Sequence, residues 1–122
     1  MSYIGGNING TLQVCETAKN ALGEGVKDWQ DKFTLTGWLD QQSGDSRYTT
    51  HLAKLEESTH VFLCDYRSDV YALTIPDKET KTVPDCRMIV KGVVYDVTFI
   101  DNPMELNEHL EISLRKVGAW NG

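Results

Sequence analysis

The last third of the chain has a strict period of two, and this pattern constrains the fold more than any other feature. Apolar residues alternate with mostly polar neighbours on both sides of Lys91–Gly92, and they alternate again from Leu110 to Leu114. Such a period places alternate side chains on opposite faces of a β-strand. Lys91–Gly92 fits a two-residue hairpin turn, because glycine adopts a positive φ without steric cost. The segment 86–117 therefore predicts three antiparallel strands.

The same alternation recurs in three earlier segments of the sequence. It runs from Thr11 to Thr17, from Phe33 to Asp40 and from Thr59 to Tyr66. The last of these segments has apolar residues on both faces, which is typical of a central strand that is covered on both sides. Between the first two, glycines and polar residues predict a loop from Ala18 to Asp28.

One short helix is predicted between Ser46 and Glu57. Tyr48, Leu52 and Leu55 lie there at a spacing that gives a helix one apolar side. The predicted fold class is therefore mainly β: a small antiparallel β-barrel or sandwich with one short helix and a long inserted loop. A closed sheet is favoured because closure removes exposed strand edges.

The long inserted loop spans residues 67–85. It contains two prolines, mixed charges and an apolar island from Val70 to Ile75. Loops of this length are uncommon in compact domains and are usually functional or mobile. The alternative is an added hairpin in which the apolar island forms an edge strand.

The length of 122 residues predicts one domain. We expect residues 1–10 to form a flexible N-terminal arm, residues 11–117 the β-barrel, and residues 118–122 a C-terminal tail. Trp38 falls on a predicted strand and is expected in the core. Trp120 lies in the tail, where it either folds back or anchors a neighbouring subunit.

Charge and motif content argue against several function classes. The net charge is −6, whereas nucleic-acid binders normally carry a basic face with stacking aromatic residues. No nucleotide-binding, hydrolase or metalloprotease motif occurs, so no catalytic, cofactor-binding or metal-binding residue is predicted. Cys15, Cys64 and Cys86 are widely spaced and are expected as buried reduced thiols. No apolar run approaches the roughly 20 residues of a membrane helix, and no signal peptide is recognised, so we expect a cytoplasmic protein.

Several segments together resemble the head-closure proteins of tailed phages, which are also called stoppers or head-completion proteins. The resemblance covers Thr11 to Val117. It rests on the spacing from Thr59–His60 to Tyr66–Arg67, on the spacing from Gly92 to Tyr95, and on the strings "VKDWQDKFTLTGWLD", "LDQQSGDSRYTTHLAKLEEST", "THVFLCDYRSDV" and "GVVYDVTFIDNPMELNEHLEISLRKV". The insertion at 67–85 departs from the family, because many relatives are more compact there.

The resemblance implies a structural protein of the virion neck, assembled in the host cytoplasm. Such proteins form a ring, here of about twelve copies or about six, below the adaptor ring on the portal. The ring closes the DNA exit channel after packaging and presents a surface to the tail terminator or the tail-tube protein. Genomic DNA passes through without tight binding, which an acidic lumen favours. No membrane is involved.

Two sets of residues are predicted to act in this role. We expect the insertion to line or plug the channel, and residues near the two ends of the chain to contact neighbouring subunits. The candidate gating residues are Asp69, Val70, Tyr71, Leu73, Thr74, Ile75, Asp77 and Glu79, and the candidate inter-subunit contacts are Tyr3, Ile4 and Trp120.

Three alternatives remain open from the sequence. The first is another ring of the neck or tail, such as a tail terminator, since an adaptor would be mostly helical. The second is a nucleic-acid-binding module with an OB-like barrel, which would need a basic groove. The third is a small-molecule enzyme on a β-barrel, which would need convergent polar groups in a pocket.

Overall fold

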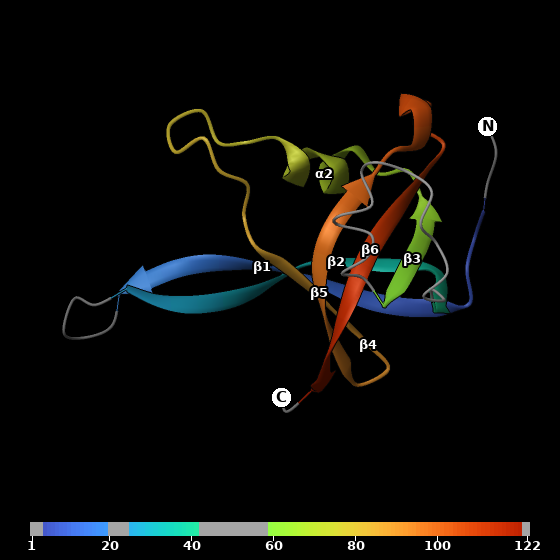
Figure 1. The fold of residues 1–122 in the computed structure, drawn as a ribbon, viewed down its shortest axis with the longest axis horizontal. Coiled ribbons are helices and arrows are strands. Elements are labelled where there is room, and N and C mark those ends of the chain that lie inside the picture. The colour runs from blue at the N-terminus through green and yellow to red at the C-terminus, as the bar shows by residue number, and fades with distance from the viewer. Residues whose placement is uncertain (1–3, 20–24, 42–58, 121–122) are drawn as a thin grey trace.

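The chain forms a closed barrel of six antiparallel strands, shown in Figure 1. This computed structural model describes residues 4–19, 25–41 and 59–120. Around the barrel the strands follow the order β1-β2-β3-β6-β5-β4, and pairing of β4 with β1 closes the sheet. The strands are β1 (Ile8–Lys19), β2 (Gly25–Gln41), β3 (His60–Asp65), β4 (Cys86–Val90), β5 (Val93–Asp101) and β6 (His109–Ala119). The predicted mainly β fold is confirmed, as a barrel rather than a sandwich.

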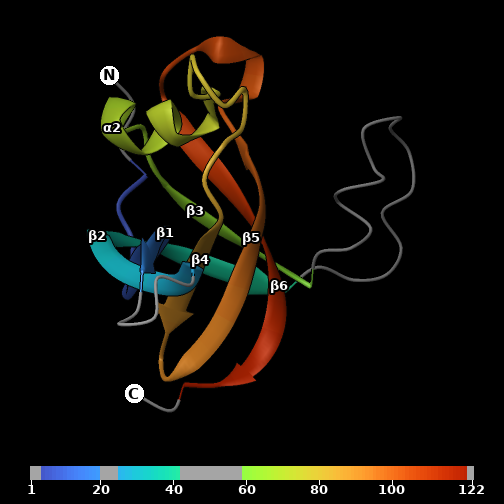
Figure 2. The same ribbon diagram turned by 90° about the vertical axis from the view of Figure 1, so that its left-hand side faces the viewer.

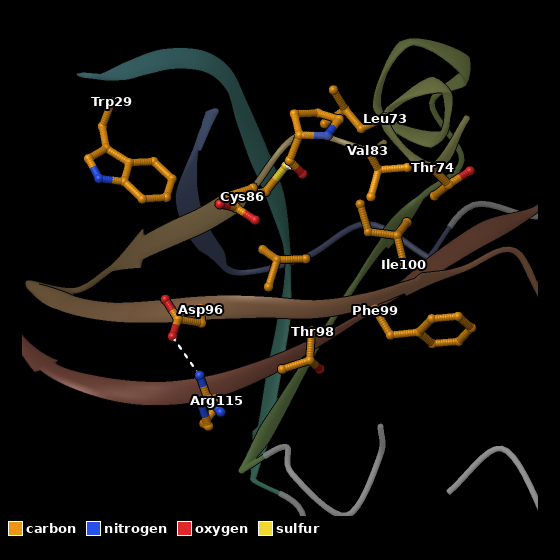
Figure 3. Close-up of a pocket in the computed structure, with 13 residues that line it drawn as sticks. Trp29, Leu73, Thr74, Val83, Cys86, Asp96, Thr98, Phe99, Ile100 and Arg115 are labelled. Carbon is orange, nitrogen blue, oxygen red and sulfur yellow. Dashed lines mark hydrogen bonds and ion pairs between the residues drawn. The ribbon is translucent and has the colours of Figure 1, made fainter. Parts of the chain in front are cut away.

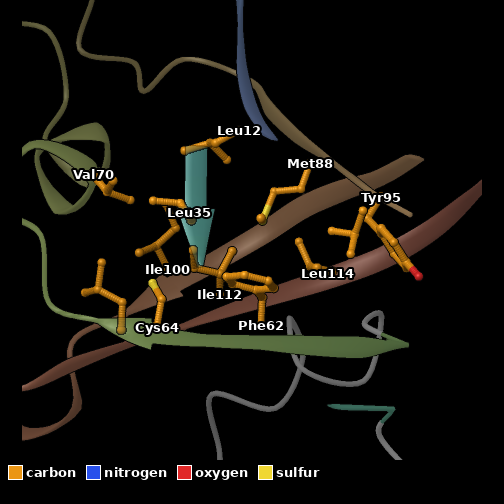
Figure 4. Close-up of a cluster of buried hydrophobic side chains, with 12 residues drawn as sticks. Leu12, Leu35, Phe62, Cys64, Val70, Met88, Tyr95, Ile100, Ile112 and Leu114 are labelled. Carbon is orange, nitrogen blue, oxygen red and sulfur yellow. The ribbon is translucent and has the colours of Figure 1, made fainter. Parts of the chain in front are cut away.

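The barrel encloses one hydrophobic core, part of which is drawn in Figure 4. Every strand contributes at least one side chain to it, as the period of two predicts. Full burial of each large apolar side chain contributes about 1.5–3 kcal/mol relative to exposure. The largest fully buried side chains are Phe62, Leu12, Leu35, Met88, Leu110, Ile112, Leu114, Val70 and Val90.

The predicted C-terminal strands are confirmed in detail. Lys91 and Gly92 connect β4 to β5 with φ values of 49° and 75°, which fits the predicted hairpin turn of positive-φ residues. The turn between β5 and β6 contains the short 3-10 helix η2, Pro103–Glu105. In the Asn102 side chain, the carbonyl oxygen accepts the Asn107 N–H at 3.1 Å and the amide donates to the Asn107 side chain at 2.8 Å, which holds this turn closed.

The first two strands are longer than predicted. β1 begins at Ile8, so residues assigned to the flexible arm form part of the barrel. Pairing of β1 with β2 continues to Lys19 opposite Gly25, so most of the loop predicted from Ala18 to Asp28 is strand. Backbone pairing overrides the local preference of glycine and polar residues at these positions. The outer parts of β1 and β2, Cys15–Lys19 and Gly25–Gln30, project from the barrel in Figure 1, and we call them the ribbon.

Gly37 allows β2 to approach β3 closely. A Cβ atom at this position would lie 2.0 Å from the carbonyl oxygen of Leu63 and 2.9 Å from the Phe62 ring. On the other side, a Cβ at Gly6 would lie 2.2 Å from the Gly37 Cα. Glycine is required here because backbone fills the space that any side chain would occupy.

The insertion contains the helical segment α2 (Ser68–Tyr71), which continues into the 3-10 helix η1 (Ala72–Thr74). The alternative of an edge strand from Val70 to Ile75 is therefore wrong. Its β-branched and aromatic residues favour a strand locally, but packing against the barrel decides the structure. Figures 1 and 2 place α2 at the end of the barrel opposite the β4–β5 turn. The helix predicted between Ser46 and Glu57 lies outside the described residues.

Trp38 does not lie in the core, contrary to the prediction. Its side chain is 43% exposed. The alternation in β2 directs Leu35 inward and Trp38 outward, on the same side as Thr34 and Thr36. The indole N–H donates to the carbonyl oxygen of Ile4 at 3.0 Å, so Trp38 holds the N-terminal segment against the barrel.

Candidate assembly surfaces

The insertion divides into a packed half and an exposed half. Val70 is fully buried, and Tyr71 and Leu73 pack against the core. Tyr71 also contacts the ring of Tyr66, with 6.2 Å between ring centroids. Beyond η1 the chain runs from Ile75 to Asp85 entirely on the surface, and we call this segment the strap.

The predicted gating residues are thereby distributed between two environments. In the packed half, Val70, Tyr71 and Leu73 close one end of the core, and the Thr74 hydroxyl donates to the Tyr71 carbonyl at 2.8 Å. In the strap, Ile75 is 65% exposed, and Asp77 and Glu79 are exposed as well.

Asp69 lies at the start of the packed half and pairs with Arg67. The guanidinium donates to both carboxylate oxygens, at 2.8 Å and 3.1 Å. This contact lowers the pKa of Asp69, although the pair is too exposed to add much stability. Arg67 also lies over the Phe33 ring and donates to the Thr34 carbonyl at 3.3 Å, so it ties the insertion to β2.

The strap has internal order despite its exposure. Backbone N–H groups of Glu79 and Thr80 both donate to the Asp77 carboxylate at 3.0 Å. These two bonds lower the pKa of Asp77, because they stabilise its charged form. The Asp77 N–H donates to the Thr82 carbonyl at 2.8 Å, which closes the turn. The tip of the strap is therefore a defined loop with a fixed negative charge.

An open pocket of about 690 Å³ lies between the strap and β5, as Figure 3 shows. Its lining combines apolar and polar side chains, and the ion pair between Arg115 and Asp96, at 2.9 Å, lies at one side. Sequence reasoning did not find this pocket, because its residues come together only in the barrel. The lining residues are Trp29, Leu73, Thr74, Val83, Pro84, Asp85, Cys86, Asp96, Val97, Thr98, Phe99, Ile100 and Arg115.

The N-terminal segment lies along the outside of the barrel. The Ile4 N–H donates to the Asp65 carboxylate at 2.7 Å, and the Asn7 N–H donates to the Gly37 carbonyl at 3.0 Å. Ile4, one of the predicted inter-subunit contacts, is therefore half-buried against its own barrel. Tyr3, another of these predictions, lies outside the described residues.

Trp120, the third predicted contact, folds back onto its own barrel. Its backbone N–H donates to the Gly92 carbonyl at 2.9 Å. The Arg87 guanidinium lies 5.3 Å from the Trp120 ring centroid and 4.3 Å from that of Trp29. Arg87 thus stacks against two indoles, which favours the cation electrostatically. Trp120 as a residue remains 38% exposed.

The β5–β6 turn exposes two apolar side chains that sequence analysis did not single out. Met104 is 88% exposed and Leu106 is 58% exposed. Glu105 and Glu108 are exposed beside them, so this end of the barrel is apolar and acidic. Met104, Glu105 and Asn107 have positive φ values, which the sequence does not indicate.

The described residues offer little reactive chemistry. Burial raises the pKa of Cys64 to about 11, with help from the charge of Asp65, and burial likewise raises that of Cys86 to about 11, with help from Asp85. Both thiols are therefore weak nucleophiles at neutral pH. Within residues 4–19, 25–41 and 59–120, no group of three His, Cys, Asp or Glu side chains is placed to hold a metal ion. No helix in the described part of the chain is long and apolar enough to cross a membrane.

Comparison with known proteins identifies a matching family and a solved structure of similar fold. The family model for phage head completion proteins matches residues 10–117. The solution structure of protein SF1141 from Shigella flexneri 2a is similar, with a TM-score of 0.64 and 19% identity over 95% of this chain and 96% of that one. At that identity the likeness concerns the fold alone. No curated protein matches the chain.

Proposed function

Because the chain belongs to the phage head completion protein family, which has a structural role in joining heads to tails, we propose that it forms a ring that closes the head after packaging. The family match over residues 10–117 carries this proposal, since it includes most or all of each of the six strands. In the proposed assembly the ring lies below the adaptor ring on the portal and provides the surface to which the tail attaches.

The distribution of polar and apolar residues supports a structural role. The core is closed and apolar, and the described surface carries exposed apolar side chains on two projections, the strap and the β5–β6 turn. Exposed apolar groups on projections are typical of surfaces that become buried in an assembly. The net charge of −6 suits a channel through which DNA slides without being held.

Within this ring we propose that the strap faces the channel and acts as its gate. Ile75 and Val83 are the exposed apolar residues of the strap, and equivalent residues from several subunits would bury one another near the ring axis. The negative charges of Asp77 and Glu79 would repel the DNA phosphates, so the gate would not bind the DNA tightly. The packed half of the insertion stays on the barrel in this scheme, so the moving part is confined to residues 75–85.

The closure function is tested by removing the protein during phage assembly. We expect filled heads that lose DNA and do not join tails, and we expect the wild-type chain supplied in trans to restore both properties. Tailed, infectious particles formed without the protein would contradict the proposal.

The gate is tested separately by cross-linking the strap. A Glu79→Cys variant, with Cys15 and Cys86 replaced and the buried Cys64 kept, is expected to form disulfides between subunits in filled heads and to block DNA ejection. Normal ejection from fully cross-linked particles would exclude the gate while leaving head closure intact.

A further inference from the structure

The two ends of the barrel carry charges of opposite sign. Figures 1 and 2 place the β5–β6 turn at one end, and the C-terminal end of β6 with the β4–β5 turn at the other. Glu105 and Glu108 are exposed at the first end, whereas Lys91 and Lys116 are exposed at the second. The net charge of the chain is −6, yet positive charge gathers at this second end. The barrel is therefore electrically polar along its length.

Each charged end also exposes two apolar residues. At the acidic end Met104 is 88% exposed and Leu106 is 58% exposed, and at the basic end Val117 is 60% exposed and Trp120 is 38% exposed. Exposed apolar residues beside charged ones are typical of surfaces that bind another protein. We call these groups the acidic patch and the basic patch, which consist of Met104, Glu105, Leu106 and Glu108, and of Lys91, Lys116, Val117 and Trp120, respectively.

The acidic patch is held in one shape by its own chain. Asn102 is 4% exposed, and its side chain makes two hydrogen bonds to Asn107 across the turn. Met104 and Glu105 have φ values of 55° and 53°, which are costly for residues other than glycine and persist only where the surroundings fix them. A surface that is already ordered loses little conformational entropy when it binds.

The basic patch is fixed in a similar way. The Trp120 backbone N–H is bonded to the Gly92 carbonyl, directly after Lys91. The Lys116 N–H donates to the Thr59 hydroxyl at 2.8 Å. Both patches are therefore formed before any contact with another chain.

We propose that the acidic patch of one copy binds the basic patch of the next copy. This inference rests on the proposed ring and names the contact that builds it. Charge complementarity identifies a second copy of this chain as the occupant, because each patch carries two charges opposite in sign to those of the other, and two patches of one kind would repel. Identical chains joined through two different surfaces build head-to-tail rings when the rotation closes. Patches at opposite ends of a barrel suit a ring of about twelve copies, in which each copy turns by about 30°.

Charge reversal tests this contact. Each variant is supplied in trans to phage that lacks the protein, and its copies per particle are counted. Glu105→Lys/Glu108→Lys, the acidic-patch variant, should reduce incorporation by about tenfold or more, because like charges then meet in every contact. Lys91→Glu/Lys116→Glu, the basic-patch variant, should do the same. A chain with all four changes, the combined variant, should be incorporated as the wild-type chain is, because opposite charges meet again.

A matched control separates the patch from the net charge. Asp28→Lys/Asp40→Lys changes two exposed residues of β2 and alters the net charge by the same amount as the acidic-patch variant. We expect it to be incorporated normally. All the changed side chains are exposed, so every variant should keep the Tm of the wild-type chain to within about 4 °C.

The outcomes separate this inference from the proposed function. A combined variant that is incorporated as poorly as the two single-patch variants would show that the patches bind other proteins, and would overturn the inference while head closure stands. Normal incorporation of either single-patch variant, or an equal loss of the control, would overturn it as well. Necks that assemble with no copy of this chain would overturn both.

Discussion

The barrel wall and the strap place their apolar residues in opposite environments. In the wall, Phe62, Leu110 and Ile112 are fully buried, whereas in the strap Ile75 and Val83 are 65% and 48% exposed. The packed half of the insertion lies between the two regions in the chain, and its Val70 enters the core of the wall. The contrast indicates that the wall determines folding and the strap is available for contacts with other chains. Substitutions in the two regions should therefore have separable effects.

A charge in the wall is expected to have the largest effect. Ile112→Asp would bury an unpaired carboxylate and should cost about 5 kcal/mol or more, which is comparable to the whole stability of a small domain. Far-UV circular dichroism should show loss of the β signal. The matched strap variant Val83→Asp should change the free energy of unfolding by about 0.5 kcal/mol or less. A folded Ile112→Asp protein would show that this strand face is not part of the core.

The close contact at Gly37 is the next most sensitive point of the wall. Gly37→Ala places a Cβ against the Leu63 carbonyl, and a backbone oxygen within a sheet has no room to yield. We expect a loss of about 2–4 kcal/mol, read as a fall in Tm of roughly 8 °C or more. Gly118→Ala is the control, because no atom lies within 4 Å of the added Cβ. Equal Tm values for the two variants would mean that β2 and β3 are farther apart than described.

The two halves of the insertion can be compared directly by truncating one residue in each. Val70→Ala removes fully buried methyl groups and should cost about 2 kcal/mol in urea unfolding. Ile75→Ala should cost about 0.5 kcal/mol or less, because most of its side chain is already in water. Similar losses of unfolding free energy at both positions would contradict the distinction between the packed half and the strap.

The stacking of Arg87 between Trp29 and Trp120 should give a smaller effect. Arg87→Ala is expected to cost about 1 kcal/mol from lost cation–π contacts and the lost bond to Gln13. A double-mutant cycle with Trp120→Ala should give a coupling energy of about 0.5–1 kcal/mol. Additive losses would mean that Trp120 does not hold Arg87 in solution.

His60 should give the smallest effect, visible as a pH dependence. Burial, and then the positive charge of Lys116, lower the pKa of His60 in the folded chain. Because the unfolded chain then binds the proton more tightly, His60 lowers stability as the pH falls through about 6.5 and toward its folded pKa. Replacing His60 by Gln should flatten the fall in Tm over that range. An unchanged pH profile would contradict this assignment.

The sequence predicted the parts of the fold that local pattern controls. Alternation identified β5 and β6, and Lys91–Gly92 identified the turn before them, because period and turn chemistry are local properties. The ribbon, the helical segment at Ser68–Thr74 and the outward position of Trp38 depend on pairing and packing with distant residues. The pocket depends on the point at which β4 leaves β5, which no local pattern records. The family resemblance supplied the function, while the surfaces that would carry it required the fold.

The central claim is that this barrel joins the head to the tail as a ring in the virion neck. Electron microscopy of particles that carry a label fused after Gly122 tests this claim most directly. We expect the label at the head–tail junction and, after averaging, a ring whose subunits fit the barrel. Label along the tail, label on the capsid surface, or its absence from virions would contradict the account.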